Sequence, residues 1–352
     1  MGKRVQHAGI LLLAVLLLVG IAAMQQGKKE RNRYETSFFD SFDTVTTITG
    51  YAKSQEAFEE QTKLLQEKLM HYHQLFDIYH TYDGINNLKS INDNAGKSPI
   101  PVDEEIIELL KLGIEMHQKT NGQINIAYGS VLSIWHEYRE QGMADPAGAQ
   151  VPPEELIQEM AAHTDISRLV IDENQATVFL EDGEMSLDVG SIGKGYAVQR
   201  ITEYAKELGM DHFLISVGGN VSAVGAKADN TPWLVGIENP DLESSEAYIG
   251  TVELADQTIV TSGDYQRYYM VDGKRYCHII NPETGMPPEY VPSVSVLTND
   301  SGMADALSTA LFNMEVSEGL ELAESLPGTE ALWVMKDGGI RCSSGFEFHE
   351  KE

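Results

Sequence analysis

An uncharged run at residues 8–24 is the feature that most constrains what this 352-residue chain can fold into. Its centre reads ILLLAVLLLV, and the basic residues Lys3 and Arg4 precede it. Side chains this apolar must be buried, either in lipid or in a protein core. The run is near the lower length limit for a helix that crosses a bilayer, and a basic flank before it is typical of a secretory signal or an uncleaved anchor.

The flanks of this run leave three alternatives open. Residues 20–22 and 22–24 match a small-x-small cleavage site poorly, and no cysteine directly follows the run to carry a lipid, so a retained anchor is favoured over a cleaved signal. Four basic residues within 28–33 count against export under the positive-inside rule. A buried core helix is the third alternative, which the uniform apolarity disfavours. We predict an anchor and basic juxtamembrane stretch at residues 1–33, and a domain at residues 34–352 on the extracytoplasmic side of the cell membrane.

The charge of the chain excludes most nucleic-acid partners. Lys and Arg total 25 against 54 Asp and Glu, a formal net charge of −29, and beyond residue 33 the counts are 19 basic and 53 acidic residues. Such a surface repels phosphate backbones, so we expect no nucleic-acid binding. The two cysteines, Cys277 and Cys342, are too few for a disulfide scaffold or a Cys-type zinc site, and we expect two buried, unpaired thiols.

Helical and strand patterns mix along the chain without strict alternation. Apolar residues recur with a helical period in residues 55–76, 102–120, 195–208, 303–314 and 317–326. Strand-like runs occupy residues 37–52, 169–180, 184–187, 213–217, 233–237, 248–254, 258–261, 293–297, 331–336 and 339–342. No linker is long enough to divide the domain. The pattern predicts an α+β fold, a single compact domain with mixed sheets and surrounding helices, rather than a doubly wound sheet.

A glycine-punctuated turn carries the densest set of candidate site residues. Residues 186–196 read SLDVGSIGKGY, a strand that runs through a turn with Lys194 into a helix. Glycines let the backbone approach a ligand closely, and a helix N-terminus offers free N–H groups to an anion. The turn lacks the GxxxxGK[ST] pattern of a nucleotide triphosphatase. An ordinary strand-to-helix turn with an exposed lysine is the alternative.

Two further motifs suggest a ligand and a metal ion. Gly218, Gly219 and Asn220 form a second backbone-exposing turn after a strand, so two strand ends could converge on one ligand. Asp305 and Thr309 lie four residues apart on a predicted helix and share one face. A carboxylate with a hydroxyl oxygen suits a hard cation such as Mg²⁺, although Asp305 could simply cap the helix and Thr309 bond to a backbone carbonyl.

His278 is the candidate general base. It ends a strand beside a Pro/Gly turn, where an imidazole could meet a substrate. A single histidine is more often structural, and Asp264 is a weaker candidate for the same role. The sequence contains no HExxH metal motif and no GxSxG nucleophile turn.

Taken together, these segments resemble the ApbE family of FAD:protein FMN transferases. The matching stretches follow the family order from about residue 38 to residue 345: Phe42-Asp43-Thr44-Val45, NGQINIAYGSVLSIW at residues 121–135, DVGSIGKGYAVQR, ISVGGNVSAVG, TSGDYQRYYMVDGKRYCHIINPETG and ADALSTALF. The resemblance implies an ApbE-like domain that, with Mg²⁺, splits FAD at its pyrophosphate. It would move FMN to a threonine hydroxyl of an acceptor protein and release AMP.

The resemblance also implies roles for particular residues. Asp305 and Thr309 fall on the metal-binding side chains, and Ser191 falls where the family offers a backbone carbonyl to the same ion. His278 and Asp305 are the catalytic candidates. The positions that match FAD-contacting residues of the family are Phe42, Gln123, Ile124, Asn125, Asp188, Lys194 and Ile279.

This sequence departs from common family forms at two positions. Asn281 and Asn125 each stand where an aspartate is usual, so each keeps an acceptor oxygen and loses a charge. Two rival functions remain: a Mg²⁺-dependent FAD pyrophosphatase that yields FMN and AMP, and a membrane-tethered flavin-binding protein without catalysis. The expected acceptor is a membrane redox-complex subunit that carries FMN on threonine, reached by a domain tethered through the N-terminal segment.

Overall fold

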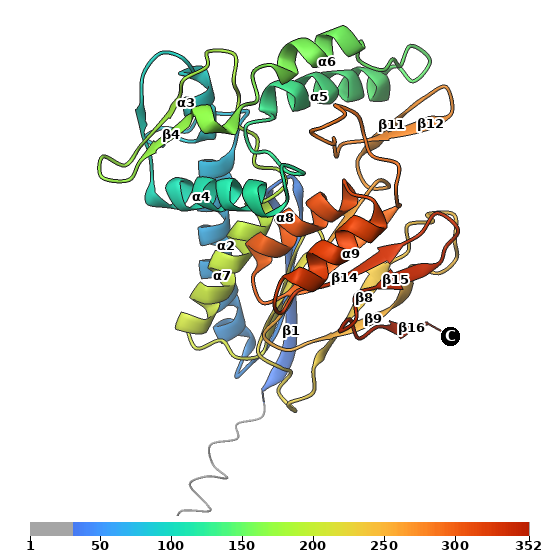
Figure 1. Ribbon diagram of the computed structural model, residues 1–352. Coiled ribbons are helices and arrows are strands. Elements are labelled where there is room, and N and C mark those ends of the chain that lie inside the picture. The colour runs from blue at the N-terminus through green and yellow to red at the C-terminus, as the bar shows by residue number, and fades with distance from the viewer. Residues whose placement is uncertain (1–30, 352) are drawn as a thin grey trace, which may run out of the picture.

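An eight-stranded, entirely antiparallel sheet forms the centre of the molecule (Figure 1). The computed structural model describes residues 31–351. The strand order is β1-β2-β6-β7-β10-β13-β14-β15. The bounds are β1 Asn32–Ser41, β2 Thr44–Ala52, β6 Phe213–Val217, β7 Asn220–Val224, β10 Thr258–Gly263, β13 Ser293–Thr298, β14 Glu330–Val334 and β15 Ile340–Cys342.

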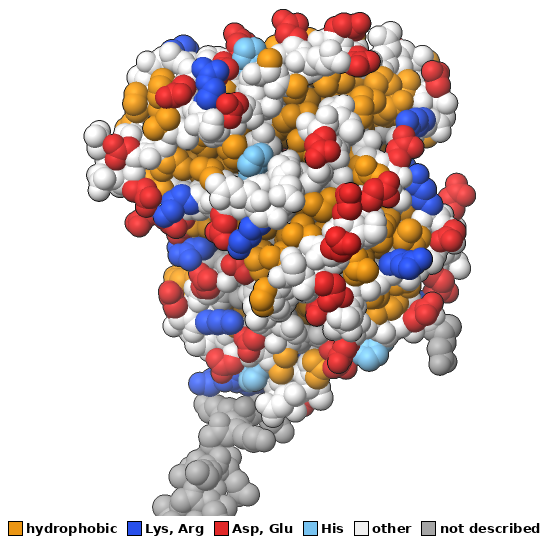
Figure 2. All heavy atoms as spheres, viewed as in Figure 1, with side chains coloured by type: hydrophobic (Ala, Val, Ile, Leu, Met, Phe, Trp, Pro, Cys, Tyr) orange, Lys and Arg blue, Asp and Glu red, His pale blue; other side chains and the backbone are white. Residues whose placement is uncertain are grey.

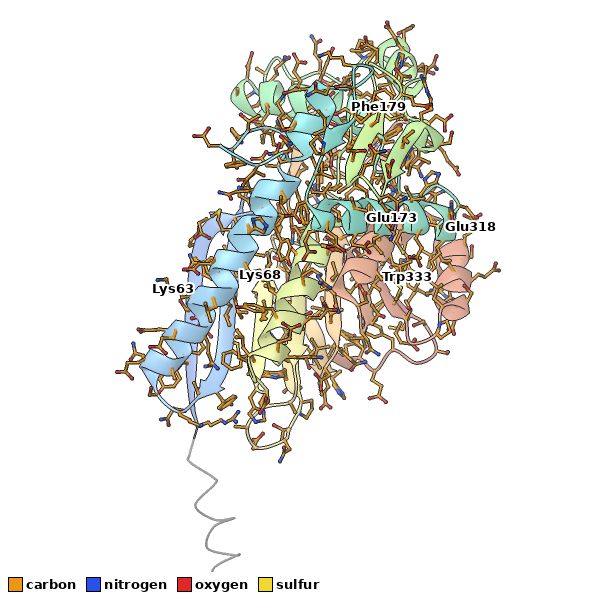
Figure 3. The ribbon with its side chains drawn as sticks, turned by 90° about the vertical axis from the view of Figure 1, so that its left-hand side faces the viewer. Lys63, Lys68, Glu173, Phe179, Glu318 and Trp333 are labelled. Carbon is orange, nitrogen blue, oxygen red and sulfur yellow. The ribbon has the colours of Figure 1, made fainter. Side chains whose placement is uncertain are left out.

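Helices cover one face of this sheet. The helices nearest to it are α2 (Gln55–Phe76), α7 (Gly193–Glu207), α8 (Ser301–Phe312) and α9 (Val316–Ser325), which lies on β14, with α4 (Glu104–Lys119) packed outside α8. The largest apolar core lies between these helices and the sheet, where Val217 and Val260 are completely or almost completely buried. Figure 3 shows α2 lying along β1 with α7 beside it.

A three-stranded antiparallel sheet covers part of the opposite face. It consists of β8 (Trp233–Glu238), β9 (Tyr248–Leu254) and β16 (His349–Glu350). Trp233 and Leu254 pack there against Ile259 and Leu297 of the main sheet in a second apolar cluster. Because side chains alternate between the faces of a strand, Ile259 and Val260 of β10 serve the two different cores.

A smaller group of elements stands at one end of the main sheet. It contains α3 (Leu88–Asp93), α5 (Gly129–Ala144), α6 (Glu154–Ala161), the 3₁₀ turn η1 (Ile166–Arg168), and a sheet of β3 (Ile100–Pro101), β5 (Thr177–Leu180) and β4 (Leu169–Asp172). The hairpin of β11 (Tyr268–Val271) and β12 (Lys274–Cys277) packs against α5 through Tyr269 and Trp135. Figure 1 shows these elements above the sheet.

The predicted α+β fold is confirmed, with differences in detail. The helix predicted at 55–76 matches α2, and the 213–217 and 248–254 strands match β6 and β9. The strand predicted over 37–52 is in fact the β1–β2 hairpin, because Phe42 and Asp43 adopt left-handed φ values of 54° and 49° at its turn. Residues 184–187 are not a strand and make only an isolated bridge at Ser186. The strand predicted over 169–180 is the β4–β5 hairpin. Elements that the periodicity did not predict are α3, α5, α6, η1, β3, β7, β11, β12 and β16.

The predicted anchor at residues 8–24 lies outside the described residues. Within residues 31–351, every helix is too short or too polar to cross a bilayer. The first described strand begins at Asn32. Both thiols are free; Cys277 is buried as predicted, whereas Cys342 is half-buried. Figure 2 shows acidic and basic side chains interspersed over the face drawn, without a continuous basic area on it.

Candidate functional site

A cavity of about 1350 Å³ lies where the end of the main sheet meets the smaller group of elements. This volume exceeds the roughly 300–1,000 Å³ typical of small-molecule pockets, so a dinucleotide could share the space with part of a second molecule. The structure brings eleven of the residues predicted for the site to the lining of this one cavity: Phe42, Gln123, Ile124, Asn125, Asp188, Ser191, Lys194, His278, Ile279, Asp305 and Thr309. Their chemical roles stay predictions. Asp264, the weaker candidate for the general base, does not line it and instead pairs with Arg275 at 2.9 Å.

The crossing of α7 and α8 fixes the acidic centre of the site. Asp305 is 3% exposed, and its Oδ2 accepts a 2.7 Å hydrogen bond from the N–H of Gly195. Its Oδ1 lies 3.5 Å from Nζ of Lys194. A Cβ atom on Gly195 would stand 2.2 Å from the carbonyl oxygen of Ser301, so only glycine lets the two helices approach this closely. The carboxylate therefore sits at the N-terminus of α7, opposite the predicted phosphate-binding lysine.

Oxygen atoms dominate the surroundings of Asp305. Thr309 lies one turn further along α8, and its Oγ1 is 3.4 Å from Oγ of Ser262 on β10. Ser191 belongs to the turn that leads into α7 and lines the same cavity. Within residues 31–351, no group of three or more His, Cys, Asp or Glu side chains could hold a metal ion. One carboxylate with hydroxyl and carbonyl oxygens fits Mg²⁺, which keeps several waters, and not a zinc-type site.

Asp188 is held by backbone contacts on both sides. Its Oδ1 accepts a 2.8 Å hydrogen bond from the N–H of Gly190, and burial raises the pKa of its carboxyl group. The preceding residue, Leu187, exchanges two hydrogen bonds with the side-chain amide of Asn92, at 2.8 and 3.0 Å. Asn92 therefore pairs with this segment much as a neighbouring strand would, although residues 184–187 have no strand partner of their own.

The two asparagines that replace the usual aspartates both use their amide N–H groups. Nδ2 of Asn281 donates to the carbonyl oxygen of Asn313 at 2.8 Å, and Nδ2 of Asn125 donates to that of Thr164 at 2.8 Å. An ionised aspartate could not make either bond, because it has no hydrogen to donate. Asn313 in turn donates to the carbonyl oxygen of Gln123 at 2.9 Å, so this amide chain fixes the backbone of the predicted flavin-contacting residues.

His278 is enclosed and electrically neutral. Its Nδ1 is buried without a hydrogen-bond partner among the described residues, and its backbone N–H donates to the carbonyl oxygen of Arg267 at 3.0 Å. Burial, and after it the nearby charges of Arg267, Arg139 and Lys194, lower the pKa of the imidazole to about 3. At neutral pH the ring therefore offers a free nitrogen lone pair towards a cationic part of the cavity.

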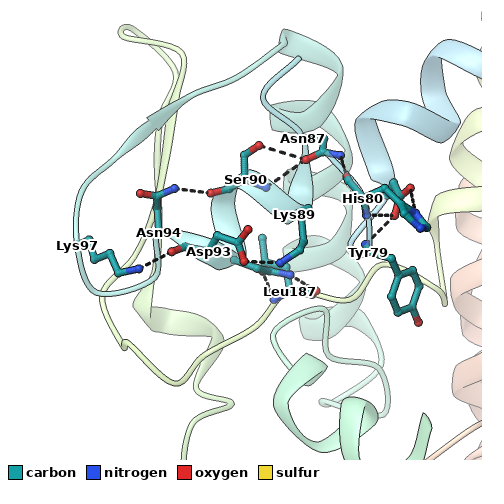
Figure 4. A network of polar contacts seen from close by, with 11 residues as sticks. Tyr79, His80, Asn87, Lys89, Ser90, Asp93, Asn94, Lys97 and Leu187 are labelled. Atoms are coloured by element: carbon teal, nitrogen blue, oxygen red, sulfur yellow. Dashed lines mark hydrogen bonds and ion pairs between the residues drawn. The ribbon is translucent and has the colours of Figure 1, made fainter. Parts of the chain in front are cut away.

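A tight loop after α2 carries cavity residues that the sequence did not single out. Asp77 is buried, and it accepts hydrogen bonds from the N–H of Tyr79 at 2.6 Å and from the hydroxyl of Tyr82 at 2.7 Å. Tyr79 is 54% exposed, and its ring lies 5.4 Å from that of His136 on α5. In Figure 4 the ring of Tyr79 points away from the hydrogen-bonded cluster. A flat exposed aromatic at a cavity wall can stack on a planar ligand ring.

The neighbouring polar network anchors this loop to α3. Asn87 is completely buried and donates to the carbonyl oxygens of Gln74 at 3.1 Å and His80 at 2.8 Å, while it accepts from Ser90 (Figure 4). No helix or strand was predicted in this segment. No sequence signal links it to the cavity, because its contacts with α5 and with Leu187 join residues far apart in the chain.

Comparison with known proteins identifies the family. The sequence profile described as the ApbE family matches residues 42–333. A protein of Treponema pallidum named FAD:protein FMN transferase is 29% identical, over 95% of this chain and 92% of its own length. The crystal structure of the ApbE protein of Thermotoga maritima has a TM-score of 0.79 and 29% identity, over 91% of this chain and 100% of its own. The flavin transferase ApbE from Vibrio cholerae has a TM-score of 0.74 and 25% identity, over 90% and 98% of the two chains. Because the profile spans most of the domain and the fold agrees throughout, the chain belongs to the ApbE family.

Proposed function

We propose that this protein transfers the FMN part of FAD to a threonine hydroxyl of an acceptor protein and releases AMP. The names of its relatives support flavin transfer as the activity. The observation that carries the proposal is the convergence of three kinds of group on one cavity: the Asp305–Thr309 oxygen pair, Lys194 at the N-terminus of α7, and the neutral imidazole of His278. A phosphoryl transfer needs charge neutralisation, phosphate binding and a proton acceptor.

Binding of FAD would use residues on opposite walls of the cavity. Phe42, Gln123, Ile124, Asn125 and Ile279 would contact the flavin part, with Tyr79 as an additional stacking surface. Lys194 at the start of α7 would bind the pyrophosphate, and Asp188 would contact FAD from the turn before it. In a strongly acidic domain these local donors offset the overall negative field.

A magnesium ion would be held by Asp305, Thr309 and the carbonyl oxygen of Ser191. When bound, Mg²⁺ neutralises charge on the pyrophosphate and stabilises the phosphate that leaves. The 3.5 Å contact between Lys194 and Asp305 leaves Oδ1 of the carboxylate weakly engaged, so this atom could serve as a metal ligand. Asp305 would thus act in catalysis by fixing the charge arrangement around the pyrophosphate.

The transfer exchanges one P–O bond for another. The threonine oxygen of the acceptor forms a bond to the phosphorus of the FMN half, and the bond from that phosphorus to the bridging oxygen breaks, so AMP leaves with the bridging oxygen. The threonine proton must be removed, and the imidazole of His278 is the proposed acceptor. Arrival of the anionic pyrophosphate near Arg267, Arg139 and Lys194 offsets the charges that hold the pKa of His278 low, so substrate binding makes the imidazole a stronger base.

Two other activities use the same residues. A FAD pyrophosphatase would replace the threonine hydroxyl by water and yield free FMN and AMP. A flavin-binding protein without catalysis would need neither the oxygen pair at Asp305 and Thr309 nor a neutral, unpartnered histidine. The cavity volume of about 1350 Å³ favours the transferase, because hydrolysis by water needs no room for part of a second protein.

We also propose that the protein works at the cell membrane, with its catalytic domain on the extracytoplasmic side. The uncharged run at residues 8–24 and the basic residues Lys3 and Arg4 before it support this location, against the four basic residues within 28–33. The acceptor would then be a membrane redox-complex subunit that carries FMN on threonine.

Mass spectrometry of an acceptor domain tests the activity. The full chain is incubated with FAD, Mg²⁺ and the candidate acceptor, and the acceptor is digested to locate any modification. A mass gain of one FMN on threonine, absent with EDTA, is the expected result. Release of FMN and AMP with several acceptors unmodified would establish the pyrophosphatase instead, and FAD binding without any turnover would establish a flavin-binding protein.

A further inference from the structure

A buried amide with an unused N–H group lies in the floor of the cavity. Asn220 is 1% exposed and lines the cavity, and its Nδ2 has no hydrogen-bond partner among the described residues. Buried polar groups are almost always hydrogen-bonded, because leaving one unpaired destabilises the folded state. An unpaired donor that faces a cavity is therefore a candidate contact for a ligand.

The β6–β7 hairpin gives this side chain one position. Gly218 and Gly219 form its turn with φ values of 52° and 93°, and the N–H of Gly218 donates to the carbonyl oxygen of Val45 at 3.1 Å. A Cβ atom on Gly218 would stand 2.4 Å from Oγ1 of Thr44, so the turn is packed directly against the β1–β2 hairpin. Asn220 follows as the first residue of β7 and cannot shift without moving this contact.

The topology places Asn220 beneath the N-terminus of α7. Only residues 208–212 separate α7 from β6, so the helix runs back antiparallel to the strand and its first turn lies over the β6–β7 turn. Asn220 pairs with Val217 on one side and with Val260 on the other. Directly opposed residues point to the same face, and Val217 and Val260 both belong to the core beneath the helices.

The same face of the sheet carries the proposed metal site. Ser262 lies two residues beyond Val260 on β10, so its side chain points to the same face. Its Oγ is 2.8 Å from that of Ser308 and 3.4 Å from Oγ1 of Thr309 on α8. Asn220 therefore lies between the phosphate-binding end of α7 and the oxygen pair of α8.

From this placement we propose that Asn220 is a phosphate ligand whose Nδ2–H donates to a non-bridging oxygen of the FAD pyrophosphate. The inference rests on the proposed function and names one of its substrate contacts. A neutral donor suits this position, because it binds the phosphate without competing with the metal ion for Asp305. The unpaired N–H of the free protein is satisfied only when the substrate is bound.

Thr46 provides a matched control, because it lies in the same row of directly paired residues that crosses the sheet through Val217 and Asn220. It pairs with Val217 on the side opposite Asn220, is completely buried, and also has an unpartnered side-chain oxygen. It does not line the cavity. If an unpaired polar atom in this row were only a feature of packing, the two residues would behave alike on substitution.

The test compares Asn220→Leu, Asn220→Asp and Thr46→Val in the full chain. Binding of FAD in EDTA, which prevents turnover, and of riboflavin, which has no phosphate, is followed by flavin fluorescence. We expect both Asn220 variants to weaken FAD binding by about tenfold or more and to leave riboflavin binding within about twofold. Asn220→Asp should bind FAD more weakly than Asn220→Leu, because its charge repels phosphate. With Mg²⁺ and acceptor, kcat should fall by about 10²-fold, as for other lost transition-state donors. Thr46→Val should change neither affinity.

Thermal unfolding separates ligand binding from a structural role. Asn220→Leu removes an unpaired buried polar group, so its Tm without ligand should equal or exceed that of the wild type. Equal weakening of FAD and riboflavin, or a lowered Tm with unchanged FAD affinity, would overturn the inference. The proposed function fails separately: if the wild type flavinylates no acceptor but its FAD affinity still depends on Asn220, the phosphate contact stands and the transferase does not.

Discussion

At the scale of single residues, Asp305 both contacts α7 at its crossing with α8 and is the proposed carboxylate ligand of the metal ion. One carboxylate oxygen accepts the N–H of Gly195, and the other lies at the edge of contact with Lys194. The side chain is buried, so its charge acts in a poorly solvated environment where electrostatic interactions are strong. A metal ion and an anionic substrate would complete a site that now holds one carboxylate and one lysine.

Asp305→Ala should abolish FMN transfer in the presence of Mg²⁺, with a loss of at least about 10³-fold, because it removes the only carboxylate of the proposed metal site. The measurement is the rate of acceptor flavinylation across a Mg²⁺ titration. The control is Asp300→Asn, which keeps an acceptor for the N–H of Met303 at the start of the same helix and should retain wild-type activity. Full activity of Asp305→Ala would remove the metal assignment.

His278 should make the free energy of unfolding decrease as the pH falls below 6.5. Its pKa is about 3 in the folded protein against an ordinary 6.5, so below pH 6.5 the unfolded chain binds a proton that the folded chain does not. The contribution of this residue to stability is complete above pH 6.5 and falls by ~2 kcal/mol between pH 6.5 and pH 5. Urea unfolding of wild type and His278→Gln across this range should give curves that converge as the pH falls. Parallel curves would contradict the buried, neutral histidine, and replacement of the exposed His349 serves as the control.

At the scale of elements, local sequence predicted some parts of the structure and missed others for physical reasons. The α2 helix was predicted because its apolar face repeats with the helical period and Ser54 accepts from the N–H of Ala57 as its cap. The α5 helix was missed because its inner residues have two kinds of surroundings. Val131 packs in an apolar cluster, His136 lines the cavity, and Leu132 and Trp135 do both, so apolar and polar residues do not separate into two clear faces.

The sequence likewise predicted some residues of the candidate site and missed others. Lys194, Asp305 and Thr309 lie in motifs whose spacing points to a site, and the structure brings them to one cavity. Asp77 and Tyr79 could not be found from the sequence, because a buried aspartate in a turn looks like any other turn residue. Their connection to α5 and to the 187–190 turn exists only after the chain has folded.

Gly195→Ala should separate α7 from α8. The new methyl group would stand 2.2 Å from the carbonyl oxygen of Ser301, and backbone atoms there cannot rotate away. We expect a loss of about 2 kcal/mol in the free energy of unfolding and a large loss of FAD binding, since Lys194 moves with the helix. The comparison is Gly319→Ala on α9, where the nearest atom is 3.2 Å away on the ring of Trp333 and the cost should be smaller. Equal stability and binding in the two variants would show that the close crossing is not needed.

Asp77→Ala should loosen the loop that carries Tyr79. Hydrogen bonds from Tyr82, Tyr79 and His80 together lower the pKa of the Asp77 carboxyl despite its burial, so it is ionised and organises the turn. We expect the KM for FAD to rise about tenfold with kcat within about twofold, because the loop binds flavin but does not touch the reacting phosphate. Asp229→Ala, which removes an equivalent turn contact with Thr231 in another loop, should leave both constants unchanged. A fall in kcat at unchanged KM would contradict this assignment.

At the scale of the whole molecule, the distribution of charge bears on both the substrate and the proposed membrane location. The domain carries 53 acidic and 19 basic residues beyond residue 33, yet Lys194, Arg139 and Arg267 all line the cavity. An anionic substrate is therefore attracted locally while the rest of the surface repels polyanions. The basic residues outside the domain gather around the uncharged run at residues 8–24, where they could contact anionic lipid headgroups.

The proposed anchor should be lost when charges are placed within the run. With arginine at both Leu12 and Leu16, insertion becomes unfavourable by about 3 kcal/mol for each charge, so the variant should leave the membrane fraction or fail to be exported. Cell fractionation of the full chain, combined with protease treatment of intact spheroplasts, measures both the attachment and the side on which the domain lies. A wild-type chain found in the soluble fraction would refute the anchor, and a protected domain would refute its extracytoplasmic position.

The length of β1 sets the distance between the start of the described domain and the cavity. The β1 strand begins at Asn32, and its ten residues end at the hairpin turn where Phe42 and Asp43 line the cavity. At about 3.3 Å per residue, the cavity lies roughly 30 Å from the point where the described domain begins. An attachment through that end would hold the reaction centre well clear of the bilayer surface. Acceptor threonines at that height would be modified without the enzyme leaving the membrane, whereas threonines close to the lipid would be out of reach.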